Sequence, residues 1–157
     1  MKYIKSFLLF ALLVLFPFFS WYYLRGGINY RKQALKELEN KTALPAEVQS
    51  IYTPTMEDQI TLFNMGGSES SISKLNDQFG KVPEYRSIDL TQASDSLAII
   101  ARQSLGTYQD KAYLLVDDSM RLRRTYVEND EDLKLLVKHI ATLLPFDIKK
   151  KENKDDK

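Results

Sequence analysis

The sequence contains no cysteine and a single histidine, His139. The absence of cysteine excludes disulfides, thiol chemistry and thiolate metal sites, and it leaves the redox compartment undefined. The single histidine restricts nucleophilic catalysis, because a serine hydroxyl needs a base to activate it. The serines at 68, 70 and 71 therefore have only one imidazole in the chain to serve them.

Net charge is also nearly absent. The 157 residues include 22 Lys and Arg against 21 Asp and Glu. Three of the basic residues (Lys2, Lys5 and Arg25) lie in or beside an apolar N-terminal run, which leaves 19 basic against 21 acidic residues, a net charge of −2. A nearly neutral domain has no general electrostatic attraction for nucleic acid, so we expect no nucleic-acid partner.

One long apolar run is present at residues 7–24 (FLLFALLVLFPFFSWYYL), without a charged side chain. At a rise of about 1.5 Å per residue, a helix of this length covers about 27 Å, close to the hydrocarbon thickness of a bilayer. The run predicts an N-terminal transmembrane signal-anchor at residues 1–25 and makes the lipid bilayer an expected partner. The residues expected at the membrane interface are Trp21, Tyr22, Tyr23 and Arg25.

A cleaved signal peptide is the alternative interpretation of this run. It would begin with the same basic and apolar residues, but SWYYLRGG lacks the small residues of a cleavage site. The pattern therefore favours an uncleaved anchor. Basic residues follow the run as well as precede it, so the charge rule comes close to a tie on sidedness.

Residues 26–58 are predicted to form a stalk. Gly26-Gly27 is expected to break the first helix, and residues 30–41 (YRKQALKELENK) predict a short surface helix because they are rich in helix formers. Pro45 and Pro54 bracket a connecting segment, in which residues 48–52 (VQSIY) could form a short edge strand.

Residues 59–146 predict one α/β domain. Strands are expected at 59–64, 84–90, 111–116 and 121–127, from apolar runs and alternation. Helices are expected between them: one ends at Gly80, one is capped by Ser94 or Asp95 and ends at Gly106, and one is capped by Asn129 or Asp130 and ends at Pro145. The order is β-α-β-α-β-β-α, with a parallel first pair and a final hairpin, which is the thioredoxin core. The charged residues 147–157 predict a disordered tail.

The C-terminal part of this domain resembles the Sco/SenC proteins. The matching residues are Val116-Asp117, Leu122-Arg123, Tyr126 and the capped helix from Asp130. That family also places an N-terminal anchor before a thioredoxin-like domain. The likeness covers residues 59–145 and implies a single-pass protein of the bacterial inner membrane whose domain faces the periplasm.

Sco proteins bind copper through a Cys-x-x-x-Cys loop and a histidine, and they serve assembly of the copper centre of cytochrome oxidase. The residues at the loop position here are Gly66, Gly67, Ser68, Glu69, Ser70 and Ser71. The histidine position, counted back from Val116-Asp117, falls at Gln109 or Asp110. Because all three ligands are missing, the resemblance implies a degenerate scaffold with no catalytic residue, cofactor or metal.

Other roles for single residues stay open. The helix start after Gly67 presents backbone N–H groups that could hold a small anion, although a serine hydroxyl or Glu69 can satisfy them instead. The methionines that could bind Cu(I) are Met56, Met65 and Met120, on separate segments. Turn chemistry explains Asp117 and Asp118. Helical spacing places His139 towards the polar face of the last helix, so we expect it to be exposed.

A basic run occupies the second hairpin strand. Alternation places Arg121 and Arg123 on one face, and Arg124 with Leu122 on the other. These guanidinium groups could bind the carboxylates of a partner or lipid phosphates. They could equally protect an edge strand from unwanted pairing, and the sequence leaves both open.

The sequence therefore predicts a non-catalytic, membrane-anchored, thioredoxin-like subunit or assembly factor of an integral membrane protein complex. Through the family resemblance, that complex would be the respiratory cytochrome oxidase. Two alternatives remain: weak methionine-based copper handling, and a small-anion binding module at the helix start of residues 66–71.

Overall fold

The structure is a computed structural model that describes residues 2–39, 41–56, 58–92 and 95–144; at 2–9, 11, 12 and 55 it describes the backbone alone. Two compact units make up the chain, residues 1–37 and 38–157. The predicted cap at Ser94, the helix end at Pro145 and the tail at 147–157 lie outside the described residues.

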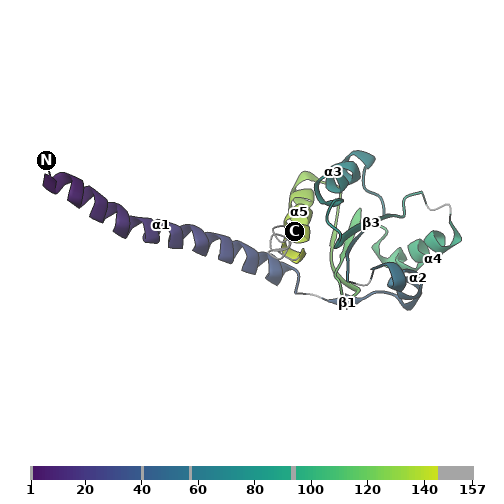
Figure 1. The fold of residues 1–157 in the computed structure, drawn as a ribbon. Coiled ribbons are helices and arrows are strands. Elements are labelled where there is room, and N and C mark those ends of the chain that lie inside the picture. Colours follow the sequence, from purple (N-terminus) through teal and green to yellow (C-terminus); the bar gives the residue numbers. More distant parts are fainter. Residues whose placement is uncertain (1, 40, 57, 93–94, 145–157) are drawn as a thin grey trace, which may run out of the picture. The chain divides into compact units, whose positions relative to one another are not determined.

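The first unit is one helix, α1 (Lys2–Glu37), 36 residues long (Figure 1). The predicted break at Gly26-Gly27 is wrong, and the helix expected at residues 30–41 is the C-terminal part of α1. A glycine weakens a helix by only about 1 kcal/mol relative to alanine, so the strong helix formers that follow can sustain it. The expected membrane-spanning helix is not found: within the described residues, no helix has the length and apolarity to cross a membrane.

The second unit begins with a short strand and a helix, β1 (Thr42–Ala43) and α2 (Ala46–Met56). The edge strand considered at residues 48–52 is wrong, because these residues lie inside α2. Pro45 precedes α2, and its carbonyl accepts a hydrogen bond from the Gln49 N–H at 3.0 Å. Val48 and Met56 are fully buried along this helix, so helical spacing, not alternation, decides the segment.

The four predicted core strands are confirmed as β2 (Ile60–Asn64), β3 (Tyr85–Asp89), β4 (Tyr113–Val116) and β5 (Arg121–Tyr126). Within the described residues they form, with β1, one mixed five-stranded sheet in the order β1-β5-β4-β2-β3. Strand β2 is central, parallel to β3 and antiparallel to β4, and β4 forms the predicted hairpin with β5. The chain is therefore an α/β protein, as the sequence predicted.

Three predicted helices are also confirmed: α3 (Glu69–Phe79), α4 (Ser96–Ser104) and α5 (Asp130–Leu143). Gly80 is the C-cap of α3. Asn129 caps α5, since its side-chain oxygen accepts a hydrogen bond from the Asp132 N–H at 2.8 Å. Asp95 is the N-cap residue of α4 but makes no side-chain cap bond. A short 3-10 helix (Gly106–Tyr108) leads from α4 towards β4.

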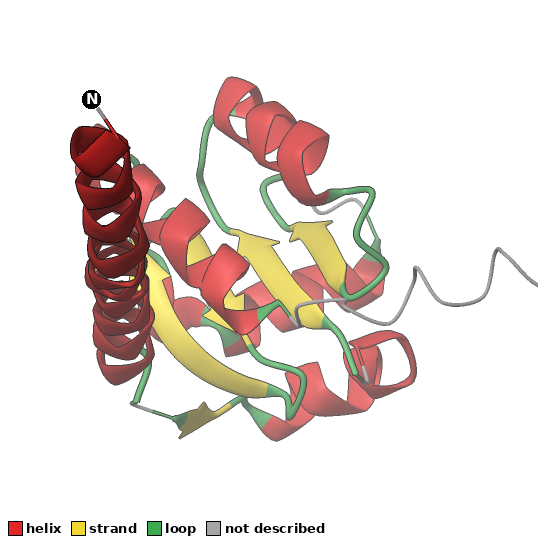
Figure 2. Ribbon diagram, turned by 60° about the vertical axis from the view of Figure 1, so that its left-hand side comes forward, coloured by secondary structure: helices red, strands yellow, loops and turns green. Residues whose placement is uncertain are grey.

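Helices cover both faces of the sheet, with α3 and α5 on one face and α2 and α4 on the other (Figures 1 and 2). The first face buries Leu75, Phe79, Tyr113, Leu136 and Ile140, among others. The second face buries Val48, Met56, Phe63, Ala101 and Leu114, among others. Because β2 and β4 are covered on both faces, every side chain along them is buried, which explains why apolar residues predominate in both strands.

Candidate functional site at the end of strand β2

The candidate site is the loop that joins the carboxyl end of β2 to α3. The Met65 N–H donates to the Ala112 carbonyl at 2.8 Å, which ties the loop to the start of β4. The Asn64 side-chain oxygen accepts from the Gly67 N–H at 2.8 Å. Ser68 then caps α3, because its Oγ accepts from the Ser71 N–H at 3.2 Å. The loop is thus held by side chains at its own two ends.

Gly67 allows an aromatic ring to pack directly against the loop. A Cβ atom at this position would lie 2.1 Å from the Tyr113 hydroxyl oxygen and 2.2 Å from its Cζ atom. No side chain fits in that space while the Tyr113 ring stays where it is. The absence of a side chain at Gly67 therefore places the buried Tyr113 ring beside the loop.

Glu128 joins these elements from the segment between β5 and α5. Its Oε1 atom accepts hydrogen bonds from Ser68 Oγ at 2.8 Å and from Ser71 Oγ at 2.7 Å. Its Oε2 atom accepts from the Tyr113 hydroxyl. We call these four residues, Ser68, Ser71, Tyr113 and Glu128, the Glu128 clasp.

The clasp moves the pKa values of both its titratable groups away from neutrality. Burial raises the pKa of Glu128, but the hydrogen bonds from Tyr113, Ser71 and Ser68 outweigh it and hold the pKa below the ordinary value of 4.5. Burial, and then the hydrogen bond and charge of Glu128, raise the pKa of Tyr113 well above its ordinary value of 10.0. A catalytic acid or base works best with a pKa near the operating pH, so neither group is tuned for that role.

A cavity of about 570 Å³ lies on the other side of the same loop. Its walls come from the carboxyl ends of β2 and β3, the loop, the start of α3 and α4. The lining residues are Asn64, Met65, Gly66, Gly67, Glu69, Ile72, Asp89, Thr91, Gln92 and Arg102. Ligands of open α/β sheets bind outside the carboxyl ends of the strands, which is the position of this cavity.

The predicted histidine position lies in the segment before β4. Gln109 and Asp110 are exposed, and the Asp110 carboxylate pairs with the neighbouring Lys111. That side-chain hydrogen bond is the main cause of a lowered Asp110 pKa. This segment instead contacts the loop through the Ala112 carbonyl, which accepts a hydrogen bond from the Met65 N–H.

The arginines do not follow the predicted alternation. Leu115 pairs with Arg124 and Val116 pairs with Leu122, so Arg123 is the extra residue of a β-bulge. Leu122 packs in the core on the side of α2, whereas Arg124 lies 5.8 Å from the centre of the Tyr126 ring, which packs on the side of α5. The prediction that Arg124 and Leu122 share a face is therefore wrong, because a bulge reverses the alternation.

Arg123 contacts one residue of the hairpin turn and one residue that precedes β1. Its Nε lies 2.8 Å from Asp117 Oδ2, and its Nη1 donates to the Leu38 carbonyl at 2.9 Å. The other Asp117 oxygen accepts from the N–H groups of Ser119 and Arg121 across the turn, as turn chemistry predicts. The Arg121 side chain is exposed, but β5 is not an edge strand, because β1 pairs with it through Thr42 and Ala43.

His139 is fully buried, so the prediction of an exposed histidine is wrong. Its Nδ1 lies 2.7 Å from the Tyr126 hydroxyl. The buried face of α5 centres on Leu136 and Ile140, whereas Leu133 and Val137 are only half-buried. At 100° per residue, the centre of Leu136 and Ile140 is turned by about 40° from the centre of the stripe that the sequence predicted, and it is turned towards His139.

The three methionines considered as copper ligands lie on different elements of the structure. Met56 and Met65 are buried core residues on the α2 side of the sheet. Met120 lies in the β4–β5 turn with a φ of 57°. Among the described residues, no group of three or more His, Asp or Glu side chains could hold a metal ion.

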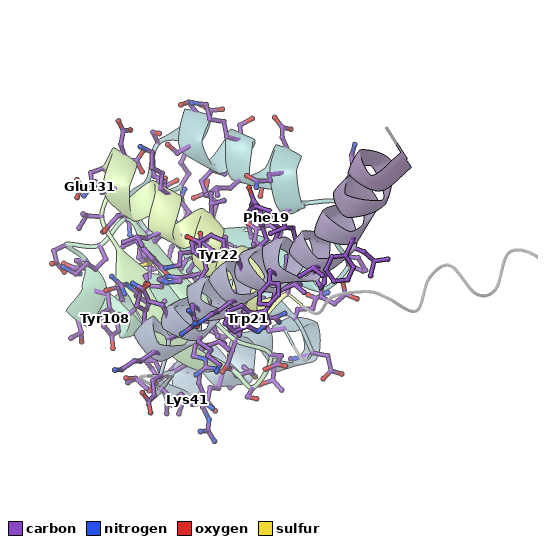
Figure 3. All side chains as sticks on the ribbon, turned by 90° about the vertical axis from the view of Figure 1, so that its left-hand side faces the viewer. Phe19, Trp21, Tyr22, Lys41, Tyr108 and Glu131 are labelled. Carbon is purple, nitrogen blue, oxygen red and sulfur yellow. The ribbon has the colours of Figure 1, made fainter. Side chains whose placement is uncertain are left out.

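The residues predicted for the membrane interface lie on α1 with most of their surface exposed. Trp21, Tyr22 and Tyr23 are 59%, 73% and 78% exposed, and Figure 3 labels the first two together with Phe19. The Arg25 guanidinium lies 5.2 Å from the centre of the Trp21 ring. Such a cation–π contact suits a side chain at the boundary between apolar and polar surroundings.

No protein-family model, curated protein or solved structure matches this chain significantly. Sequence reasoning placed the loop of residues 66–71 but missed Glu128 and Tyr113, which complete the clasp. The hydrogen bonds of Glu128 to Ser71 and Ser68 span 57 and 60 residues, a separation that local patterns do not report.

Proposed function

We propose that this chain is a non-catalytic, membrane-anchored, thioredoxin-like protein that acts as a subunit or assembly factor of an integral membrane protein complex. The strand arrangement supports the thioredoxin-like part of the proposal. In that fold the first core strand is central, parallel to the second and antiparallel to the third, and β2 has these relations to β3 and β4.

The observation that carries the non-catalytic part is the Glu128 clasp. It occupies the strand-to-helix junction where several oxidoreductase families hold their reactive groups, and its hydroxyls and carboxylate hydrogen-bond to one another. Neither Glu128 nor Tyr113 has a pKa suited to proton transfer near neutral pH. The hydrogen-bonded clasp thus has a structural role, and in this proposal the function comes from surfaces that bind a partner.

The apolar run at residues 7–24 supports the membrane anchor. Large apolar side chains of α1 are exposed, including Phe10, Leu13 and Phe16 at 67%, 66% and 69%. Soluble proteins seldom expose so much contiguous apolar surface, and a bilayer would cover it. The aromatic and cationic residues at the end of the run then lie at the interface.

The Sco/SenC resemblance supports the respiratory cytochrome oxidase as the complex, with the domain on the periplasmic side of the bacterial inner membrane. The exposed Arg121 and the half-buried Arg124 are the candidate contacts for acidic groups of that partner. Arg123 remains a candidate only if the partner competes with Asp117 for its guanidinium.

The two alternative roles receive less support from the geometry. Met65 follows Asn64, which pairs with Tyr113 at the start of β4. Met120 lies beyond the other end of β4, so Met65 and Met120 are at opposite ends of the strand. They cannot share a Cu(I) ion. At the helix start of residues 66–71, the carboxylate of Glu128 already binds Ser68 and Ser71, and its charge opposes a second anion there.

The experiment is affinity purification of the full chain from membranes in mild detergent. We expect it to stay in the membrane fraction after a carbonate wash and to copurify with the subunits of one membrane complex. Leu13→Arg with Phe16→Arg should release it to the soluble fraction. Ile28→Arg, at an exposed position of α1 outside the run, is the matched control and should not.

Two results would overturn the proposal. One is a chain that behaves as a monomer with no copurifying subunit under the mildest extraction. The other is near-stoichiometric Cu(I) uptake in equilibrium dialysis that is lost when Met65 and Met120 are replaced by leucine.

A further inference from the structure

The cavity opposite the Glu128 clasp contains two oppositely charged side chains that are fixed in place. The Nη1 atom of Arg102 donates to the Leu90 carbonyl at 3.2 Å and to the Thr91 carbonyl at 2.9 Å. Asp89 Oδ1 accepts from the Thr91 N–H at 2.9 Å and from the Thr91 hydroxyl at 2.7 Å. Both charged side chains therefore bind the same residue, Thr91.

Each of these side chains keeps polar atoms available for a ligand. Arginine has five N–H donors, and among the described residues the Nε and Nη2 groups of Arg102 have no hydrogen-bond partner. Asn64 also donates to Asp89 Oδ1, at 3.2 Å, so Oδ1 is well satisfied while Oδ2 has no such partner in the described part of the chain. A guanidinium fork recognises a carboxylate, and a carboxylate recognises an ammonium group.

The remaining walls define the rest of the ligand. Met65 and Ile72 supply apolar surface, and Gly66 leaves space, since a Cβ atom there would meet nothing within 4 Å. Glu69 adds a second carboxylate to the lining, so the cavity carries two acidic groups and one basic group. An excess of negative charge admits an ammonium group but disfavours a simple anion.

We propose that this cavity binds a small zwitterion, an α-amino acid with an aliphatic side chain. Its carboxylate binds the outer N–H groups of Arg102, its ammonium group binds Asp89 Oδ2, and its side chain packs against Met65 and Ile72. The volume of about 570 Å³ is within the range of small-molecule sites. This binding role is independent of the proposed membrane function, because it involves neither α1 nor the clasp.

The test is isothermal titration calorimetry of the full chain in detergent with three probes that share one carbon skeleton. Leucine carries both charges, 4-methylpentanoate lacks the ammonium group, and 3-methylbutylamine lacks the carboxylate. We expect leucine to bind about tenfold or more tightly than either of the others, because each lost contact is a hydrogen bond between charged groups. This comparison uses the wild-type chain alone.

Two variants assign the contacts. Arg102→Gln should remove the advantage of leucine over 3-methylbutylamine, and Asp89→Asn should remove its advantage over 4-methylpentanoate. Lys81→Gln, which removes a cation at an exposed position outside the cavity lining, is the matched control and should change neither ratio. The proposal is overturned if leucine does not bind at millimolar concentration, if the three probes bind equally, or if both variants keep the wild-type ratios.

Discussion

The loop between β2 and α3 separates two polar regions that are built differently. In the Glu128 clasp, one carboxylate accepts hydrogen bonds from three hydroxyl groups of the same chain. In the cavity on the other side, Arg102 Nη1 and Asp89 Oδ1 form hydrogen bonds with the backbone of Thr91. Arg102 Nη2 and Asp89 Oδ2 have no hydrogen-bond partner among the described residues. The clasp is complete without a ligand, and the cavity is not.

One loop can therefore contribute both to the stability of the fold and to ligand binding. A hydrogen-bonded network that satisfies its own members rigidifies the fold around it. Polar groups that are held in position but only partly bonded are suited to ligands, because little further ordering is needed on binding. Substitutions in the clasp should therefore change the free energy of unfolding, whereas substitutions in the cavity should change mainly ligand affinity.

The largest effect is expected from Gly67→Ala. The new methyl group would overlap the Tyr113 ring, which must then leave its position and lose its bond to Glu128. We expect the free energy of unfolding of the intact chain in detergent to fall by about 2 kcal/mol, a typical cost of overpacking. Urea denaturation followed by circular dichroism measures it.

A double-mutant cycle with Tyr113→Leu supplies the control. Leucine is too short to reach Gly67, so in that background Gly67→Ala should cost less than about 0.5 kcal/mol. An equal cost in both backgrounds would show that Gly67 acts through its own backbone and not through Tyr113. Gly66→Ala, at a position with open space, should be close to neutral.

Local chemistry explains why the core of the fold could be predicted. The buried strands β2 and β4 are mostly apolar, and the capping residues Asn129 and Gly80 lie where the pattern placed them. One error concerns local preference alone, in the helix that precedes the packed domain. Helix α1 continues through Gly26-Gly27, which a local rule would treat as a break.

The candidate site was predictable only in its local part. The loop of residues 66–71 follows from the order of elements, but Glu128 reaches it across the fold and no local pattern signals that contact. His139 was misplaced because the buried face of α5 depends on what packs against the helix. The faces of the arginines were also mispredicted, because Arg123 is an extra residue in β5 and strict alternation fails at such a β-bulge.

A smaller effect is expected from Glu128→Gln, which keeps the shape of the side chain and removes its charge. We expect a loss of about 1 kcal/mol at neutral pH, modest because Glu128 is partly exposed to solvent. The folded pKa of Glu128 lies below its ordinary value of 4.5. Its stabilisation is therefore fully present above about pH 4.5 and is lost as the pH falls through the folded pKa.

The pH dependence separates this account from a general loss of stability. The wild-type chain should lose stability over that acid range more steeply than Glu128→Gln, in denaturant titrations at a series of pH values. Glu84→Gln removes a carboxylate elsewhere on the domain and is the matched control. If the free energy of unfolding falls equally with pH for the wild type and Glu128→Gln, the clasp carboxylate contributes nothing to the stability of the fold.

The smallest effect on stability is expected from Asp89→Asn, on the cavity side of the loop. The amide keeps the oxygen that accepts from Asn64 and Thr91, so the contacts within the fold can survive the loss of charge. We expect the free energy of unfolding to change by less than about 0.5 kcal/mol, as for surface substitutions that break no network. Urea denaturation of Asp89→Asn and Glu128→Gln under the same conditions compares their free energies of unfolding. A cost for Asp89→Asn equal to or above that of Glu128→Gln would mean that the Asp89 charge supports the fold, and the distinction between the two sides of the loop would then fail.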